Sequence, residues 1–399
     1  MPGPLDGVRI LDLSEGYEGY TTMICAEFGA TVVKVETPAG DHLRLLGPPF
    51  VGSESAAFLG ANRGKLSVAL AWQDHAAARD ILLELIAQSD AIFVTYFPDE
   101  AETLGVRYED VRAANPEIVY CTLTPMGTTG PGANYRASEL ELQGMFGHWR
   151  YLGEPKFHHT DEAPMRLGVP VAAMNSALFA YQGLIAALLH RQRTGRGQRV
   201  DVSEMGGLIA MKNIQFAAES EPDEYEGHNV GHLRKPNLPT QTKDRPIYWG
   251  FSGADEALPK FLEAMGLGDL LADPRYANAV RLEQDGELKG RVEAQLATMP
   301  AEEAMALIRA HGGGAVYWNT FEGVSEDAQA VAMRMNASFD HPTAGTVGTT
   351  GVPWWFSESE TQVGVPPLLG QHTGEVLRML GREDAAIARL VQSGDVLVR

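Results

Sequence analysis

Two carboxylates, Glu139 and Glu141, follow Arg136 closely in the segment YRASELELQG. Paired acids can divide general acid and general base work between them, so this segment is a candidate for proton-transfer chemistry. The same pattern also fits the solvated first turn of a helix, where no chemistry is required. Composition alone favours the second interpretation, and both stay open at this point.

Other familiar catalytic and binding patterns are missing from the sequence. The turn at 14–19 reads SEGYEG and lacks the Gly-x-Gly-x-x-Gly pattern, and neither a Walker-type phosphate loop nor a Gly-x-Ser-x-Gly elbow occurs. His158 and His159 are the only adjacent histidines, and no His, Cys and Asp cluster has the spacing of a metal site. Cys25 and Cys121 lie in apolar runs, which favours a place in the core. We therefore expect no metal and no bound cofactor.

The charge balance argues against two classes of partner. The 399 residues include 52 Asp and Glu but 32 Lys and Arg, which gives a formal net charge of -20. A nucleic-acid binder needs clustered cations, and an anionic membrane surface would repel the same charge. The N-terminal segment does not resemble a signal peptide, and no run reaches the ~18 apolar residues of a membrane span. With only two cysteines, the chain is expected to be a soluble, cytoplasmic protein without nucleic-acid or membrane partners.

Segments typical of strands and helices alternate through the first half of the chain. Apolar and β-branched runs predict strands at 8–13, 31–35, 91–95, 118–123 and 199–203, and helical patterns lie at 20–28, 74–87, 108–114 and 176–190. This alternation predicts an α/β fold with a mostly parallel sheet covered by helices.

Composition changes near residues 218–246, where the chain becomes polar and rich in turn residues. This stretch is typical of a linker that leads into a second domain. Beyond it we expect a strand at 247–251, helices at 256–265, 282–297 and 301–310, and a helix in the tail at 373–380.

A series of segments, in order along nearly the whole chain, resembles the class III CoA-transferases of the formyl-CoA, carnitine and bile-acid type. The matching segments are LDGVRILDLS (5–14), AEFGATVVKVE (26–36), GPPFVG (47–52), NRGKLSVAL (62–70), LGVRYEDVRAANPEIVYCTLTPMGTTGP (104–131), LGVPVA (167–172), GLIAALLHRQRTGRGQRVDVS (183–203), TKD (242–244), HPTAG (341–345) and PPLLGQHTGEVL (366–377). No single segment identifies the family, but so many matches in the same order along the chain do indicate it.

The resemblance implies a Rossmann-like large domain built from both ends of the chain, with a smaller α+β domain inserted between them. On this basis we expect the large domain at 1–200, a linker at 201–245, the small domain at 246–330 and a return to the large domain at 331–399. Two chains of this family interlock like links, so the resemblance also implies an interlocked dimer.

The resemblance further implies a nucleophilic aspartate that this chain lacks. The family places Asp directly after Gly-Val-Pro-Val-Ala, and here Ala173 follows residues 168–172. A methyl group forms neither the mixed anhydride nor the aspartyl-CoA thioester through which the family transfers CoA. Racemases of the family use a His and an Asp at positions held here by Ser138 and Ala173, so that machinery is missing too. Glu139, beside Ser138, is the candidate for a substitute carboxylate.

A CoA thioester is the substrate that the resemblance implies, without a further cofactor. The positions implied to contact CoA are Gly16, Tyr17, Lys65, Leu70, Tyr96 and Arg136. Thr37, Gln73, Thr95 and Thr103 stand where the family has Arg, Lys, Asn and Arg, whereas Asn62 and Arg63 are retained. Loss of cations that pair with phosphate predicts weak CoA binding.

Three functions stay open on this basis. The favoured one is a non-catalytic subunit of a heteromeric member, such as an arylsuccinate CoA-transferase, whose homologous partner carries the aspartate. Its substrates would be an acyl-CoA such as succinyl-CoA and a carboxylic acid such as an aromatic succinate. The second is an active homodimeric CoA-transferase that uses another carboxylate such as Glu139. The third is a repurposed acyl-CoA lyase or binding protein.

Overall fold

The computed structural model describes residues 1–146, 169–212, 239–251, 257–272 and 286–399. His158 and His159 lie outside the described residues. The described residues form two compact units, and each is considered by itself. The first unit holds those up to 212 and from 331 onwards, and the second holds those from 239 to 330.

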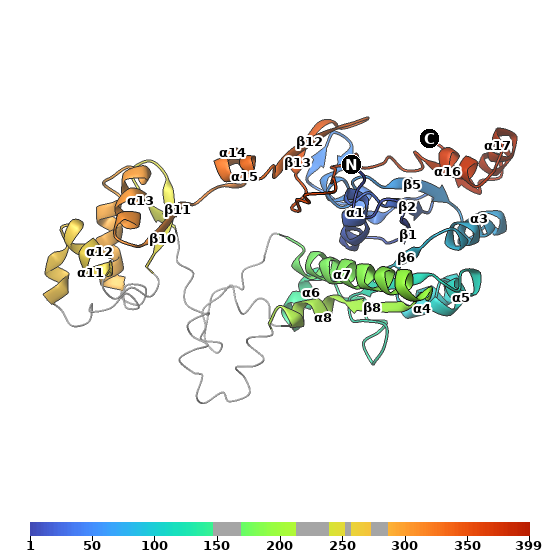
Figure 1. Ribbon diagram of the computed structural model, residues 1–399, viewed down its shortest axis with the longest axis horizontal. Coiled ribbons are helices and arrows are strands. Elements are labelled where there is room, and N and C mark those ends of the chain that lie inside the picture. Colours follow the sequence, from blue (N-terminus) through green and yellow to red (C-terminus); the bar gives the residue numbers. More distant parts are fainter. Residues whose placement is uncertain (147–168, 213–238, 252–256, 273–285) are drawn as a thin grey trace. The chain divides into compact units, whose positions relative to one another are not determined.

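A seven-stranded sheet runs through the described part of the first unit (Figure 1). Its strand order is β14-β5-β2-β1-β6-β7-β8. Neighbours from β5 to β8 pair in parallel, and β14 joins the edge antiparallel to β5. The strands are β1 (Arg9–Leu13), β2 (Thr31–Glu36), β5 (Leu66–Leu70), β6 (Ala91–Val94), β7 (Val119–Thr124), β8 (Arg199–Ser203) and β14 (Val396–Leu397). The predicted α/β fold with a mostly parallel sheet is confirmed.

Helices cover both faces of this sheet, as a parallel sheet requires. Ile10 and Leu11 are neighbours in β1, yet both are buried because they pack into clusters on opposite faces. Cys25 and Cys121 are free thiols in the same cluster as Ile10, so their predicted place in the core is confirmed. One face carries α3 (Ala76–Ala87), α5 (Tyr108–Ala114), α16 (Thr373–Met379) and α17 (Asp384–Gln392), and the other carries α1 (Tyr20–Glu27) and α7 (Val171–Thr194).

Helix α7 is longer than predicted. It begins at Val171 instead of residue 176 and ends at Thr194 instead of residue 190, and its C-cap Gly195 has a φ of 70°, in the left-handed region. By length and composition alone it could cross a membrane, contrary to the expectation that no segment could. Ala177, Ala180 and Leu184 have no exposed surface and join the core, however, so α7 packs as a core helix of this unit.

Several elements differ from the sequence prediction. Helix α8 (Glu204–Ala210) follows β8 directly, within the stretch expected to be a linker, and the Ser203 side chain caps it by accepting from Gly206 N. Helix α3 begins at Ala76 with His75 as its N-cap, later than the predicted residue 74. The sequence also does not predict β5, α2 (Ala56–Ala61), α4 (Pro98–Leu104) or the hairpin of β12 (Asn336–His341) and β13 (Gly345–Thr350), whereas α6 (Glu139–Met145) begins where a helix start was one of the two interpretations.

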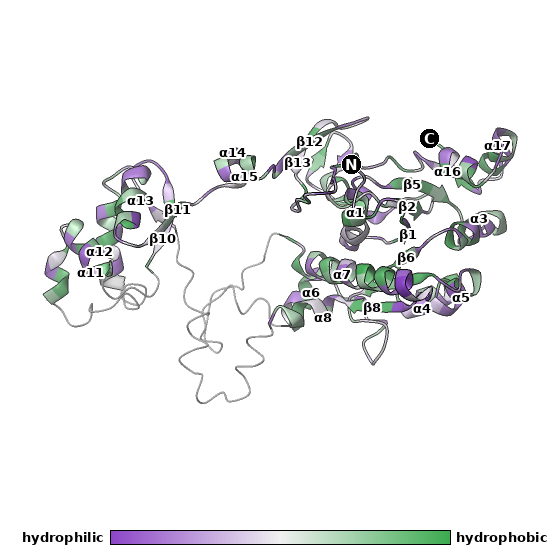
Figure 2. Ribbon diagram, viewed as in Figure 1, coloured by the Kyte–Doolittle hydropathy of each residue, from purple (hydrophilic) through white to green (hydrophobic). Residues whose placement is uncertain are grey.

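The second unit is a small α+β structure, as expected. Strands β9 (Thr240–Gln241), β10 (Pro246–Gly250) and β11 (Gly314–Tyr317) form an antiparallel sheet. Helices α11 (Ala257–Ala264), α12 (Gly286–Leu296) and α13 (Ala301–Ala310) share one core with it, which includes Trp249, Phe261 and Ile308. Figure 2 shows apolar and polar residues alternating along these helices, as expected of helices with one buried face.

Candidate functional site

The carboxyl ends of six parallel strands in the first unit meet around a pocket of about 730 Å³. The segment after β1 contributes residues 15–18, β2 leads to His42, β5 to Gln73, β6 to residues 95–97, β7 to Pro125 and β8 to Glu204. Chain order changes direction between β1 and β6 in this sheet. Open parallel sheets commonly bind their ligands at such an edge, so this pocket is the candidate site.

A buried lysine holds the segment after β1, which forms one wall of the pocket. Lys65 Nζ donates to Asp12 Oδ2 at 2.7 Å, to the Gly19 carbonyl at 2.7 Å and to Asn62 Oδ1 at 2.8 Å. The other carboxylate oxygen of Asp12 accepts from Ser14 N at 2.8 Å. The segment is therefore fixed at its start and at its end.

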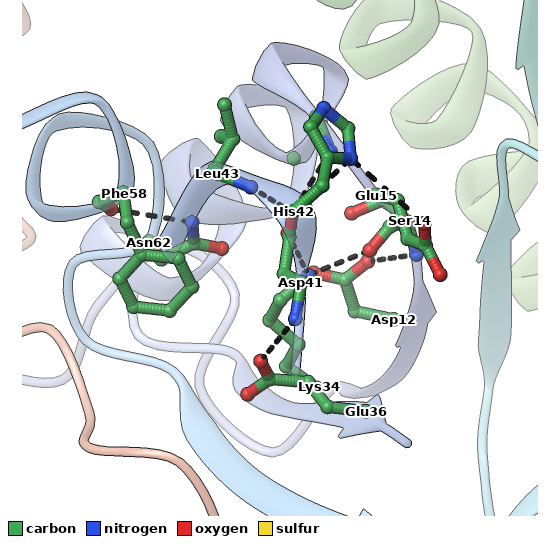
Figure 3. A network of polar contacts seen from close by, with 12 residues as sticks. Asp12, Ser14, Glu15, Lys34, Glu36, Asp41, His42, Leu43, Phe58 and Asn62 are labelled. Atoms are coloured by element: carbon green, nitrogen blue, oxygen red, sulfur yellow. Dashed lines mark hydrogen bonds and ion pairs between the residues drawn. The ribbon is translucent and has the colours of Figure 1, made fainter. Parts of the chain in front are cut away.

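A second buried lysine ties the same segment to the turn after β2 (Figure 3). Lys34 Nζ donates to the Ser14 carbonyl at 2.6 Å and pairs with Asp41 Oδ2 at 2.9 Å. Asp41 Oδ1 in turn accepts from Gly16 N at 3.3 Å and from Leu43 N at 2.9 Å. Charged side chains without exposed surface thus set the position of the backbone that lines the pocket.

The charges of this network are paired at neutral pH. Burial alone would raise the pKa of Asp12, but the ammonium groups of Lys65 and Lys34 outweigh it and lower the pKa to about 2. Burial lowers the pKa of Lys65 to about 8, so this amine stays charged at pH 7. Burial also opposes the charge of Lys34, yet Asp41 and Asp12 raise its pKa. Removing either partner would leave a buried charge uncompensated.

Two residues that the resemblance implies as CoA contacts lie away from the wall of the pocket. Lys65 is 1% exposed, and its three donors are taken by protein acceptors, so it positions the wall instead of lining it. Leu70 has no exposed surface and ends β5 inside the core. The retained Asn62 and Arg63 are buried as well. In this structure none of the four is placed to contact a ligand in the pocket.

The other implied positions gather at the pocket or beside it. Gly16, Tyr17 and Tyr96 line it, and so do the altered positions Gln73, Thr95 and Thr103, whereas Thr37 does not. Arg136 stands beside the wall, where its Nη2 lies 2.7 Å from Glu100 Oε1 and 3.5 Å from Asp99 Oδ2.

Ala173 and Glu139 are brought together although they stand on different elements. Ala173 is 4% exposed and lines the pocket beside Glu139. The Glu139 carboxylate accepts from Ala172 N at 2.8 Å, from Ala173 N at 3.1 Å and from Gln143 Nε2 at 2.6 Å. The two amides belong to the first turn of α7, where backbone donors lack partners within the helix. Glu139 therefore supplies an anion to the N-terminus of α7, at the place of the missing nucleophile.

The two acids of the 136–141 segment have separate roles. Glu141 Oε2 accepts from Ser138 N at 2.7 Å, and Ser138 Oγ accepts from Glu141 N at 3.3 Å, which forms a capping box at the start of α6. The helix-start interpretation is thus confirmed for Glu141, while Glu139 faces the pocket. The two carboxylates do not act as a pair.

A buried pair of carboxyl groups, Glu18 and Glu204, was not predicted from the sequence. Their side chains hydrogen bond to each other across the pocket wall. Burial raises the pKa of Glu18, and burial with the charges of Glu18 and Glu139 raises the pKa of Glu204 well above its usual range. Two carboxyl groups this close share a proton. Glu204 could have been predicted as a site residue because it directly follows the predicted strand at 199–203.

Glu204→Gln is expected to stabilise the protein at pH 8 by roughly 1 kcal/mol, or about 1 °C in melting temperature for a chain of this length. The folded pair keeps a proton that unfolded glutamates release above about pH 4.5, so the native state binds more protons and wild-type stability falls as pH rises. Melting curves from pH 5 to 8 should show a shallower fall for the variant. The exposed Glu109→Gln should follow the wild type, and parallel curves for Glu204→Gln would contradict a shared proton.

The described wall of the pocket is strongly acidic. It includes Glu15, Glu18, Asp99, Glu100, Glu139 and Glu204, and no Lys or Arg among the described residues lines it. His42 also lines it, and its pKa is raised, first by its hydrogen bond with Glu15. Despite these acids, no group of three or more His, Cys, Asp or Glu in the described part of the chain is arranged to hold a metal ion.

Comparison with known proteins agrees with this architecture. The model of CoA-transferase family III matches residues 5–373. The succinyl-CoA:glutarate CoA-transferase of Mus musculus is 33% identical over 98% of this chain and 90% of its own. The formyl-CoA:oxalate CoA-transferase of Streptomyces avermitilis is 28% identical over 100% of both. A crystal structure of a CaiB/BaiF family protein from Brucella suis superposes with a TM-score of 0.81 at 25% identity, covering 95% of this chain and 100% of that one.

The chain therefore belongs to CoA-transferase family III. Its similarity to succinyl-CoA:glutarate and formyl-CoA:oxalate enzymes extends over nearly the whole sequence and includes both units. CoA transfer between an acyl-CoA and a carboxylic acid is the chemistry of these relatives.

Proposed function

We propose that this chain is the non-catalytic subunit of a heteromeric CoA-transferase and interlocks in the cytoplasm with a homologous chain that carries the aspartate. The observation that carries the proposal is Ala173, a methyl group at the start of α7 where the nucleophile would stand. The acidity of the described wall supports it, because the phosphates of CoA would meet carboxylates there.

In this proposal the covalent steps occur on the partner chain. Its aspartate attacks the thioester carbonyl of the donor, forms a mixed anhydride and releases CoA thiolate. The thiolate attacks the aspartyl carbonyl, which gives an aspartyl-CoA thioester and frees the donor acid. The acceptor carboxylate then attacks the aspartyl-CoA thioester, which forms a second mixed anhydride and releases CoA thiolate. The thiolate attacks the acceptor's carbonyl, which gives the new acyl-CoA and frees the aspartate. This chain contributes packing and the enclosure of the site.

The names of the relatives guide the choice of substrates. Relatives named for succinyl-CoA with glutarate and for formyl-CoA with oxalate support a dicarboxylic acid as acceptor here. We propose succinyl-CoA as donor, and an aromatic succinate as an acceptor to be tested beside glutarate.

The test compares this chain alone, its homologous partner alone and the two co-purified, with succinyl-CoA and each acceptor. The chain alone is expected to exchange no CoA above background, and the complex should exceed it by at least about 10³-fold, since covalent catalysis is absent from the former. A high rate from the chain alone that survives Glu139→Gln would overturn the proposal.

The position of Glu139 favours one competing function, a homodimeric transferase in which this carboxylate is the nucleophile. Its Oε2 accepts from Ala173 N at 3.1 Å, and Glu139 lines the pocket. Its oxygens already accept three N–H hydrogen bonds, however, and some of these would have to break before the carboxylate could attack a thioester. This function requires that the chain alone be active and that Glu139→Gln abolish its activity.

A further inference from the structure

We infer that Asp99 and Glu100 are specificity-determining residues that keep phosphate-bearing ligands out of the pocket of this chain by occupying Arg136. The inference deepens the proposed function, on which it rests, because it names the side chains that prevent this chain's own pocket from taking CoA. It concerns ligand charge at one pocket wall and requires no catalysis.

Arg136 contacts three residues of the pocket wall. Its guanidinium stacks on the ring of Phe97 with 4.7 Å between Cζ and the ring centroid. Its Nη2 pairs with Glu100 Oε1 at 2.7 Å and with Asp99 Oδ2 at 3.5 Å. All three neighbours line the pocket, so Arg136 is the cation with which a ligand phosphate bound along this wall would form an ion pair.

Both carboxylates are fixed before any ligand arrives. Glu100 Oε2 accepts from Phe97 N at 3.1 Å, and Asp99 Oδ1 accepts from Glu100 N at 2.9 Å. Each acid thus uses one oxygen to bond the first turn of α4 and turns the other toward Arg136. Acids held in this way compete with a phosphate without a further loss of side-chain entropy.

The charge sum at this wall is unfavourable for a phosphate. Two carboxylates face one guanidinium, so the group carries a net negative charge. Arg136 is half exposed, but both carboxylates pair with its Nη2. A phosphate that reached this nitrogen would have to displace Glu100 and would then lie beside two anions within one Debye length. A ligand that carries no phosphate does not meet this cost. The pocket should therefore accept an uncharged pantetheine chain and reject the nucleotide end of CoA.

Binding by calorimetry at low salt tests the inference with the intact chain, using CoA, dephospho-CoA and pantetheine as ligands. The double variant Asp99→Asn, Glu100→Gln keeps an oxygen that can accept from each backbone N–H. It should bind CoA about tenfold more tightly than the wild type, the size expected when two nearby charges are removed. Relative to the wild type, the increase in affinity should be smaller for dephospho-CoA than for CoA, and the affinity for pantetheine should be unchanged. Added salt should abolish the increase in affinity for CoA.

Glu102→Gln is the matched control. It removes one charge from the same helix, but Glu102 pairs with Arg107 at 2.9 Å and does not line the pocket, so CoA affinity should stay at the wild-type value. Equal CoA affinity of wild type and double variant overturns the inference, as does an equal gain for pantetheine. These binding measurements involve no turnover, so equal CoA affinities would not contradict the proposal that this chain is a non-catalytic subunit. Conversely, CoA transfer by this chain alone would overturn the subunit proposal but would not change the measured affinities.

Discussion

Lys65→Met is expected to lower the free energy of unfolding by about 3–5 kcal/mol, the cost of leaving a buried charge without its partner. Methionine fills a similar volume but donates no hydrogen bond. Asp12 would then lose its nearest cation, while the Gly19 carbonyl and Asn62 Oδ1 would lose a donor, all in a region without exposed surface. The melting temperature should fall by about 4–6 °C.

Urea unfolding at pH 7 measures this effect, and Arg107→Met is its control. Both variants remove one cation, but Arg107 pairs with Glu102 and Asp110 on the surface, where it is 44% exposed, and its loss should leave the midpoint unchanged. A loss below about 1 kcal/mol for Lys65→Met would show that the buried network does not carry the paired charges described above.

Ala173→Asp is expected not to turn this chain into a transferase. The new carboxylate would stand beside Glu139, which already accepts from Ala173 N, and near Glu204, whose pKa is raised partly by Glu139. A further anion among these acids would be protonated more easily and would attack a thioester poorly. Exchange by the variant alone should stay at least about 10³-fold below that of the active complex.

The neutral variant Ala173→Asn, which has nearly the same shape, controls for changes in packing. Initial rates with succinyl-CoA and glutarate should be equal for the two variants. If Ala173→Asp alone reached a rate comparable with the complex, the alanine would be the sole defect of this chain, and the acidic wall would not matter for CoA.

The strands and main helices could be predicted from the sequence because local patterns determine them. The buried strands read as apolar runs, and α1, α5 and α13 begin and end close to the predicted residues. Helix α8 was missed because the expected division into domains placed a linker at 201–245, although Ser203 is an ordinary N-cap directly after a strand. The pattern Ser138-x-x-Glu141 carried the signal of a capping box that would have separated Glu141 from Glu139.

The site was harder to predict because its contacts join distant parts of the chain. Lys65 looks like an exposed cation in sequence, and its burial depends on Asp12 and Gly19 from another element. The pairing of Glu18 with Glu204 likewise depends on how β1 and β8 end at the same edge of the sheet. Such contacts follow from the tertiary fold, which local spacing does not encode.

Locating the covalent intermediate shows which of the two chains carries out the chemistry. The complex is incubated briefly with succinyl-CoA and quenched, and both chains are analysed by mass spectrometry with and without hydroxylamine. We expect a hydroxylamine-sensitive CoA adduct on the aspartate of the partner and an unmodified mass for this chain. A CoA adduct on Glu139, or on any other carboxylate of this chain, would contradict this expectation.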